Sequence, residues 1–200
     1  MVLQKEFSAV YDEFHPKILH YVRRMVGEQD AEGVTQVVFE KVHRRLDQFK
    51  GESSLATWIY RIATNSSLDR LKSATHRRSA AGPLAPFPLE TAEVAPGGAA
   101  GMIHKPQPPD QKIIRYEMQT CIREFIDRLP PDYRTIIILN ELEGFTNREL
   151  AVILQISVAA AKIRLHRARA QLKKYLEQGC DFYHDERSEL ACDRKQSHDP

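Results

Sequence analysis

Residues 144–174 read GFTNRELAVILQISVAAAKIRLHRARAQLKK. Thr146 followed three positions later by Glu149 forms a capping box, which predicts that a short helix begins there. Ser157 can cap a second helix after a turn of three or four residues. Two helices joined by a short turn, the second strongly basic, are the helix-turn-helix pattern of DNA-binding proteins.

The second of these helices has an apolar face and a basic face. Its apolar residues recur at spacings of four, three and four, which predicts that they face the core: Ala161, Leu165, Ala168 and Leu172. Residues 162–174 carry six basic side chains and no acidic one. Such a run can be a solvated helix face, but the capping box and the turn before it favour contact with DNA.

Upstream of this motif, the pattern predicts further helices and then a linker. Pro130-Pro131 opens a helix that ends at Gly144, and Asp110 can cap a helix that runs to about Arg128. Residues 82–109 hold seven of the eleven prolines and four of the nine glycines. Because proline lacks a backbone donor and glycine is costly to order, this stretch is predicted to be an extended, flexible linker. It could also bind an SH3-like partner, although a plain tether is the simpler reading.

The first 78 residues also show helical periodicity. One amphipathic helix stops at Gly27, and Asp30 can cap a second one. A polar break at residues 50–54 precedes a third helix from about Leu55 to Lys72. The prediction is an all-α fold with two small helical domains, residues 1–78 and 111–177, joined by a linker at 79–110 and followed by an acidic tail at 178–200.

Composition narrows the function classes. The chain has 200 residues, of which 42% are hydrophobic and 28% charged, so it can form a packed core. Its net charge of +2 is unevenly distributed, which suggests a polyanionic partner bound by a patch. No phosphate-binding loop, nucleophile elbow or zinc-protease helix is present, which argues against an enzyme. No export signal or membrane-length apolar run is found, so we expect a cytoplasmic protein without membrane insertion.

Two stretches resemble a known family. DAEGVTQVVFEKVHRRLDQFKGESSLATWIYRIATNSSLDRLKS (30–73) resembles region two of bacterial sigma-70-family factors, and LPPDYRTIIILNELEGFTNRELAVILQISVAAAKIRLHRARAQL (129–172) resembles region four. An arrangement with only these two regions and a linker is similar to that of the extracytoplasmic-function (ECF) subgroup. The chain departs from the family at Gly33, where an acid is usual, and at Ile163, where a small polar residue is common.

The resemblance implies a non-catalytic specificity subunit of RNA polymerase and assigns roles to named residues. Its expected partners are core polymerase, through the beta-prime clamp helices and the beta flap, promoter DNA and an anti-sigma factor. The minus-ten element and its flanking duplex would be contacted by Lys50, Ser53, Thr57, Trp58, Arg61, Asn65, Lys72, Arg77 and Arg78. The minus-thirty-five element would be contacted by Ser157, Lys162, Ile163, Arg164, His166, Arg167 and Arg169. The clamp helices would be contacted by Ala31, Glu32, Gln36, Phe39, Glu40 and His43.

Alternatives remain at several of these positions. Trp58, the only tryptophan, can be mainly a packing residue with one edge toward DNA. His166 can face a phosphate or the polymerase instead of a base. A two-domain transcriptional activator is the rival function, with a sensor in place of the first domain. The stretch WIYRIATN and the polar loop before it favour the sigma factor, because promoter melting needs them and a sensor does not.

The tail is not explained by the resemblance. Cys180, His184 and Cys192 provide two thiols and an imidazole, one ligand short of a tetrahedral zinc site, and Cys121 or His198 could be the fourth. Structural zinc sites more often use paired C-x2-C ligands, which are absent here. The sequence therefore predicts no cofactor, with zinc on the tail or redox sensing as the alternative to a simple acidic interaction tail.

Overall fold

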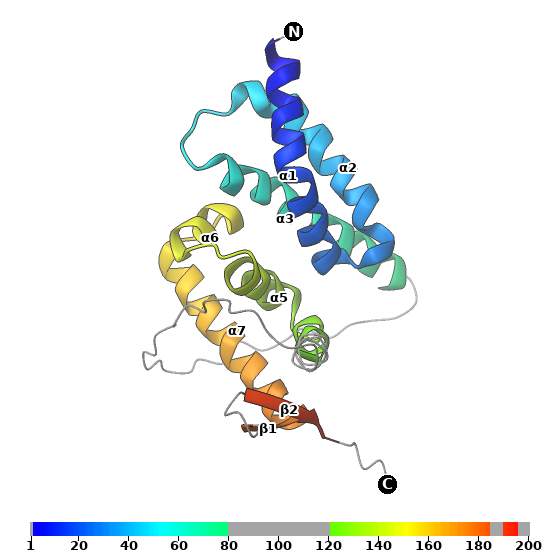
Figure 1. Ribbon diagram of the computed structural model, residues 1–200, viewed down its shortest axis with the longest axis vertical. Helices are drawn as coiled ribbons and strands as arrows, with labels where there is room; N and C mark the ends of the chain where they lie inside the picture. The colour runs from blue at the N-terminus through cyan, green and yellow to red at the C-terminus, as the bar shows by residue number, and fades with distance from the viewer. Residues whose placement is uncertain (1, 80–120, 185–189, 196–200) are drawn as a thin grey trace.

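The structure, a computed structural model, describes residues 2–79, 121–184 and 190–195. We call residues 2–79 the first half and the remaining described residues the second half. Helices form nearly all of both, and two short strands follow the last helix (Figure 1). Most of the predicted linker and the predicted start at Asp110 lie outside the described residues.

Three long helices form the first half. They are α1 (Val2–Val26), α2 (Glu28–Arg45) and α3 (Leu55–Ser79), with a 3-10 turn, η1 (Leu46–Gln48), before the polar loop. α1 ends at Gly27 as predicted: Gly27 adopts a φ of 86°, which favours glycine, and its N–H donates to the Arg23 carbonyl at 3.0 Å.

The predicted cap of the second helix is wrong. α2 begins at Glu28 without a side-chain cap, so Asp30 lies inside its first turn. The Asp30 carboxylate instead accepts a 2.6 Å hydrogen bond from Arg70 of α3. α3 begins at Leu55 as predicted, because Ser54 Oγ accepts from the Thr57 N–H at 3.1 Å, but it extends beyond the predicted end at Lys72.

The second half contains the predicted helix-turn-helix. Residues 121–127 are helical, and α5 (Pro131–Ile137) follows. Pro131 is the first residue of α5, a position where the backbone N–H would have no partner within the helix, so proline is tolerated there. The chain continues as a π-helical segment, η2 (Ile138–Leu142), and leaves it through Gly144 at a φ of 78°. α6 (Asn147–Leu154) has both hydrogen bonds of the capping box between Thr146 and Glu149. α7 (Val158–Gly179) is capped by Ser157, so the predicted capping box and the predicted Ser157 cap are both confirmed.

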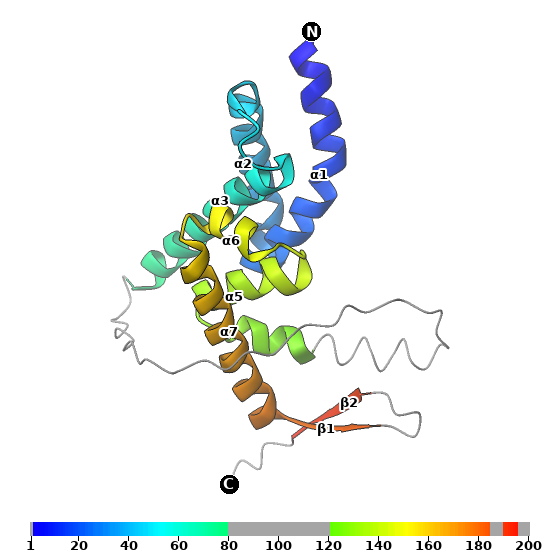
Figure 2. The ribbon, with the colours of Figure 1, turned by 90° about the vertical axis from the view of Figure 1, so that its left-hand side faces the viewer.

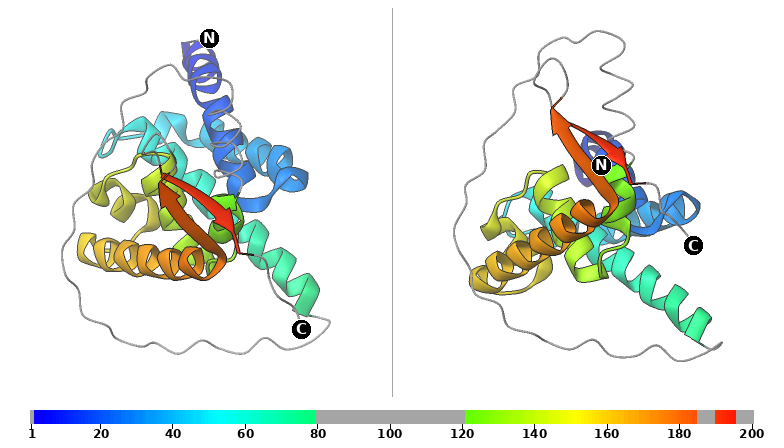
Figure 3. Two further views of the ribbon diagram at one scale, coloured as in Figure 1. Left: turned by 60° about the horizontal axis from the view of Figure 1, so that its bottom comes forward. Right: turned by 90° about the horizontal axis from the view of Figure 1, so that it is seen from below.

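A two-stranded ribbon follows α7, where the sequence indicated only an acidic tail. β1 (Cys180–His184) pairs antiparallel with β2 (Leu190–Arg194), with Phe182 opposite Cys192. The ribbon lies at the far end of the molecule from the N-terminus (Figure 1, bottom) and beside the end of α7 (Figure 3). Phe182 and Tyr183 are residue types that favour strands, but a run this short does not predict a ribbon by itself.

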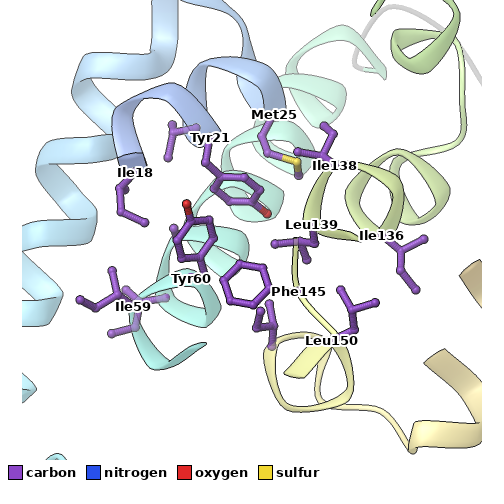
Figure 4. Packing of buried hydrophobic residues seen from close by; sticks show 14 of the residues in the cluster. Ile18, Tyr21, Met25, Ile59, Tyr60, Ile136, Ile138, Leu139, Phe145 and Leu150 are labelled. Carbon is purple, nitrogen blue, oxygen red and sulfur yellow. The ribbon is translucent and has the colours of Figure 1, made fainter. Parts of the chain in front are cut away.

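The two halves share one hydrophobic core. α6 lies beside α3 in both side views (Figures 1 and 2), and buried residues of both halves form one continuous cluster. The rings of Tyr60 and Phe145 meet edge to face with their centroids 4.7 Å apart, and Tyr21 packs on Tyr60 at 5.1 Å (Figure 4). This packing brings the helix-turn-helix against the first half, a relation that no local sequence pattern specifies.

Candidate nucleic-acid interface

We call α7, the second helix of the helix-turn-helix, the recognition helix. It has the apolar face and the basic face that its sequence predicts. Ala161, Leu165 and Ala168 are buried, and Leu172 packs against the same core. On the other side Lys162 is exposed and Ile163 is 47% exposed, whereas His166 and Arg167 are half-buried. A basic helix with these side chains free at its N-terminal end is suited to a major groove.

Two of the arginines predicted to contact the minus-thirty-five element bind acids of the same half. Arg169 donates to Glu141 Oε1 at 2.7 Å and to Asn140 Oδ1 at 2.9 Å. Arg164 forms a looser pair with Asp132 at 3.9 Å. The Arg169 pair is exposed and the Arg164 pair is long and partly exposed, so both are weak and can exchange for a phosphate. Ser157 is the remaining residue predicted in this motif, and its hydroxyl oxygen accepts a hydrogen bond from the Ala160 N–H.

At the start of α3 the predicted residues divide into accessible and inaccessible ones. Thr57 is buried, and its hydroxyl is 2.8 Å from the hydroxyl of Ser54. Thr57 therefore stabilises the start of α3 in this arrangement, and its contact with DNA stays a prediction. Trp58 is half-buried against Phe49, with ring centroids 5.4 Å apart. That placement matches the interpretation of a packing residue with one open edge.

A basic pocket of about 320 Å³ lies beside Trp58. Arg61 and Asn65 line it from α3, as predicted, and Lys41 and Arg45 line it from α2. It has three cations and no acid among its lining residues, a charge distribution that suits phosphate groups. The sequence analysis missed Lys41 and Arg45, although their i, i+4 spacing puts both on one face of α2.

Gln155 of the helix-turn-helix lies over this pocket. With its amide oriented so that the oxygen faces Arg61, it accepts from Arg61 Nε at 2.9 Å and also from Nη2. Gln155 is held in place by the turn itself, at a φ of 56°. The sequence gave no signal for this residue, because its partner is 94 positions away in the first half. The turn of one DNA-binding motif therefore occupies the cationic surface of the other.

The other residues predicted to contact the minus-ten region are less constrained. Lys50 and Lys72 are exposed, and Ser53 is half-buried with its hydroxyl donating to the Ser54 carbonyl at 3.3 Å. Arg77 and Arg78 belong to α3, but their side chains lie outside the described part of the structure.

A second concave surface lies between α1 and α2, where the clamp contact was predicted. Its volume is about 470 Å³, and Glu32, Gln36, Phe39, Glu40 and His43 all line it. α1 contributes residues that the sequence analysis missed: Phe7, Tyr11 and His15. Their rings form a stack in which Phe7 lies 4.6 Å from His43 and Tyr11 lies 4.8 Å from Phe39.

Two of the predicted clamp residues face inward. Ala31 is fully buried in this arrangement, and its contact with the clamp helices stays a prediction. Phe39 is only 4% exposed and mainly supports Tyr11. Gly33 lies at the edge of this surface, and nothing lies within 4 Å of the position its Cβ would take. The departure from the family pattern at Gly33 is therefore not required by packing.

A polar network joins the halves next to the shared core. Glu143 accepts from Arg24 Nη1 at 2.9 Å with one oxygen and from the Tyr60 hydroxyl at 2.7 Å with the other. Arg134 donates to the Met25 carbonyl at 2.9 Å, at the end of α1. Burial raises the pKa of Tyr60, and acceptance of its hydrogen bond by the Glu143 carboxylate raises it further. Tyr60 is therefore a neutral donor in this network.

The tail cysteines meet a third cysteine and not the predicted histidine. Cys180 is buried, and its Sγ is 3.7 Å from Sγ of Cys121. His184 is exposed on β1, and His198 lies outside the described residues. In the residue ranges described here, no group of three or more His, Cys, Asp or Glu side chains is arranged to hold a metal ion. Within the same ranges, no helix combines the length and the apolar character needed to cross a membrane.

Comparisons with protein families match both halves. The family described as "Sigma-70 region 2" matches residues 10–77, and "Sigma-70, region 4" matches residues 119–172. The chain is 31% identical to the RNA polymerase sigma-H factor of Pseudomonas aeruginosa over 175 residues, which cover 87% of this chain and 88% of the relative. It is 31% identical to the ECF RNA polymerase sigma factor SigW of Bacillus subtilis over 180 residues, with 86% and 90% coverage. It is 32% identical to the ECF RNA polymerase sigma-E factor of Escherichia coli K12 over 166 residues, with 83% and 84% coverage.

Solved structures share the fold. CnrH in complex with the cytosolic domain of CnrY aligns with a TM-score of 0.58 at 21% identity, covering 88% of this chain and 90% of CnrH. The sigma factor RpoE in complex with the anti-sigma factor NepR, from Bartonella quintana, aligns with a TM-score of 0.62 at 20% identity, covering 86% and 98%.

Proposed function

The chain belongs to the sigma-70 family of RNA polymerase sigma factors, in the ECF group, and on that premise we propose how its surfaces divide the work of promoter recognition. Like other sigma factors it is a non-catalytic subunit that directs transcription initiation. The assignment of individual residues to DNA and to polymerase is the proposal made here.

The exposed face of α7 reads the minus-thirty-five element. Lys162 and Arg167 supply donors for base edges, and Ile163 supplies an apolar contact that suits a thymine methyl. The support is the exposure of this face at the N-terminal end of a helix whose opposite side is buried in the core.

The basic pocket and the open edge of Trp58 hold the minus-ten element. Lys41, Arg45 and Arg61 neutralise phosphates, while the half-exposed indole offers a stacking surface for an unpaired base. Gln155 and a DNA phosphate cannot bind Arg61 in the same way at the same time. The described arrangement is therefore a DNA-free state, and promoter binding requires the two halves to separate.

The aromatic surface between α1 and α2 docks on core polymerase. Its exposed acids, Glu32 and Glu40, and its ring stack fit a partner helix with basic and apolar side chains. An anti-sigma factor is the expected second partner, since the two solved structures compared above are complexes and one is described as bound to an anti-sigma factor. A sigma factor acts in the cytoplasm, where polymerase and DNA are.

The observation that carries the proposal is the pair of cationic surfaces, one on α7 and one beside Trp58, within a sigma-family fold. Run-off transcription with purified core polymerase on genomic fragments tests it. We expect discrete start sites that require both the chain and core polymerase, with core polymerase alone as the control. Tight promoter binding without polymerase, together with unchanged start sites, would establish the activator instead.

A further inference from the structure

Three cysteines distant in sequence gather at the end of the recognition helix. Cys121 lies on the helical residues 121–127, Cys180 follows α7, and Cys192 is on β2. The Cys121 and Cys180 sulfurs are 3.7 Å apart although the residues are 59 positions apart. All three are free thiols. Neither the promoter surfaces nor the polymerase surface uses this cluster.

A close helix contact creates the pair. Gly179, the last residue of α7, packs so tightly on the Phe125 ring that a Cβ at Gly179 would overlap it. Phe125 is four positions after Cys121 and so lies on the same face of its helix. The approach of Gly179 to Phe125 therefore brings the next residue, Cys180, onto Cys121.

Cys121 is the thiol suited to pair with Cys180. Cys180 and Cys192 lie on the same face of the ribbon but are not directly opposite each other. Cys180 pairs with Arg194 and Cys192 pairs with Phe182, so the two cysteines are offset by two residues. Diagonal neighbours on a ribbon are about 7–8 Å apart, with their Cβ atoms somewhat closer, whereas a disulfide needs a Cβ–Cβ separation of roughly 3.5–4.5 Å. The Cys192 side chain still lies close enough to interact with the Cys180 thiol, so Cys192 is the competing partner that the test must distinguish. No ribbon register constrains Cys121, and its sulfur already touches that of Cys180.

We propose that Cys121 and Cys180 form a reversible disulfide when the chain meets hydrogen peroxide, so that oxidation joins the end of the recognition helix to the first described helix of the second half. The half-exposed Cys121 thiol loses its proton and its sulfur attacks hydrogen peroxide. The O–O bond breaks, the expelled hydroxide takes up that proton and leaves as water, and Cys121 becomes a sulfenic acid. The Cys180 sulfur then attacks Cys121 Sγ, the S–O bond breaks, and the hydroxide leaves as a second water with the Cys180 proton. Two thiols are oxidised and one peroxide is reduced to two waters.

The order of these steps follows from the surroundings of each sulfur. Burial, with the neighbouring thiols, raises the pKa of Cys180 to about 12, so Cys180 is a poor first target for peroxide. It contacts Cys121 directly, which is what a resolving thiol requires. The bridge encloses α5, α6 and α7, and a covalent loop of this size restricts the unfolded chain.

The test treats the reduced, full-length chain with equimolar hydrogen peroxide and then counts free thiols and maps peptides without reductant. We expect the thiol count to fall from three to one, a linked peptide pair containing Cys121 and Cys180, and full reversal by dithiothreitol. The Cys192→Ser variant is the matched control and should lose both remaining thiols. Cys121→Ser and Cys180→Ser should form no intrachain link.

A second readout is the denaturant midpoint. The oxidised chain should unfold at a higher midpoint than peroxide-treated Cys121→Ser, and the two should unfold alike after reduction. Cys121 is half-exposed, so this variant is expected to fold. A Cys180–Cys192 link, cross-linked dimers, equal midpoints after oxidation, or thiols protected by a metal that purifies with the chain would each overturn the proposal.

Discussion

The Tyr60 hydroxyl of α3 donates a 2.7 Å hydrogen bond to the Glu143 carboxylate, which lies 83 positions later in the chain. The other carboxylate oxygen accepts from Arg24 of α1, and both side chains of that ion pair are mostly buried. Glu143 thus holds two helices of the first half against the second half. Gln155 of the same half lies over the basic pocket.

Glu143→Gln should loosen the contact between the halves. Glutamine loses the charge that Arg24 faces and one of the two acceptors, so we expect the free energy of unfolding to fall by about 1–3 kcal/mol. Because Trp58 is the only tryptophan and lies in the pocket under Gln155, its emission should shift to the red as the pocket opens. Glu177→Gln, which removes an exposed pair with Lys173, is the control and should change neither quantity. Unchanged stability and emission in Glu143→Gln would show that the rings alone hold the halves together.

Acid should weaken the same contact through His20. Burial and then the charge of Arg24 lower the pKa of His20 below 6.5, while Glu143 opposes them. At pH values between the folded and unfolded pKa the unfolded chain binds more protons, so the free energy of unfolding falls as the pH drops through 6.5 and stops falling below the folded pKa. Urea midpoints measured from pH 8 to pH 5 should decline less in His20→Gln than in the wild type. Parallel curves would exclude His20 as a source of the decline.

Trp58→Ala should impair promoter opening more than promoter binding. The variant removes the stacking surface beside the basic pocket and also the packing on Phe49. We expect weak transcription from duplex templates and partial rescue on a template with a pre-melted minus-ten region. Circular dichroism of the variant separates this effect from unfolding, and equal activity on both templates would contradict a role in melting.

Base reading by α7 can be separated from its general charge. Lys162→Ala and Arg167→Ala should each make the free energy of promoter binding by the polymerase complex less favourable by about 1–3 kcal/mol. Each should also weaken the preference for one base pair over another at particular upstream positions. Lys174→Ala is the charge-matched control, an exposed lysine near the other end of the helix, and it should weaken all sequences alike. Binding titrations on single-base-pair variants of the promoter measure both effects. Sequence-independent losses in all three variants would refute base reading by this face.

Alanine substitutions at two glycines should change the free energy of unfolding in opposite directions. Gly33→Ala, within α2 and facing open space, should raise the free energy of unfolding by up to about 1 kcal/mol. Gly27→Ala should lower it by about 1–2 kcal/mol, because a φ of 86° strains any residue with a Cβ. Denaturant titration of both variants measures the two changes. Destabilisation by Gly33→Ala would mean that α2 needs the glycine for a reason other than space.

Much of the local structure could be predicted because its causes lie within a few residues. The capping box at Thr146, the Ser157 cap and the stop at Gly27 each depend on neighbours in the chain, and all three are confirmed. The Asp30 cap failed because a distant arginine, Arg70, competes for the same carboxylate.

The candidate site was predictable where it depends on one helix and not where it depends on several. The basic face of α7 follows from its own periodicity, whereas the basic pocket needs α2, α3 and the turn at Gln155 together. Thr57 and Ala31 lie in the stretch that resembles the family, but packing buries both side chains.

The sequence by itself determined the helices, the caps at Thr146 and Ser157, the helix-turn-helix and the family, because helix formation and capping are satisfied by hydrogen bonds between residues three or four positions apart. The tertiary structure decided which surfaces remain open, that Glu143 links Tyr60 and Arg24, and that Cys121 meets Cys180. These relations depend on apolar burial between distant segments, and that interaction has no direction and no fixed sequence spacing.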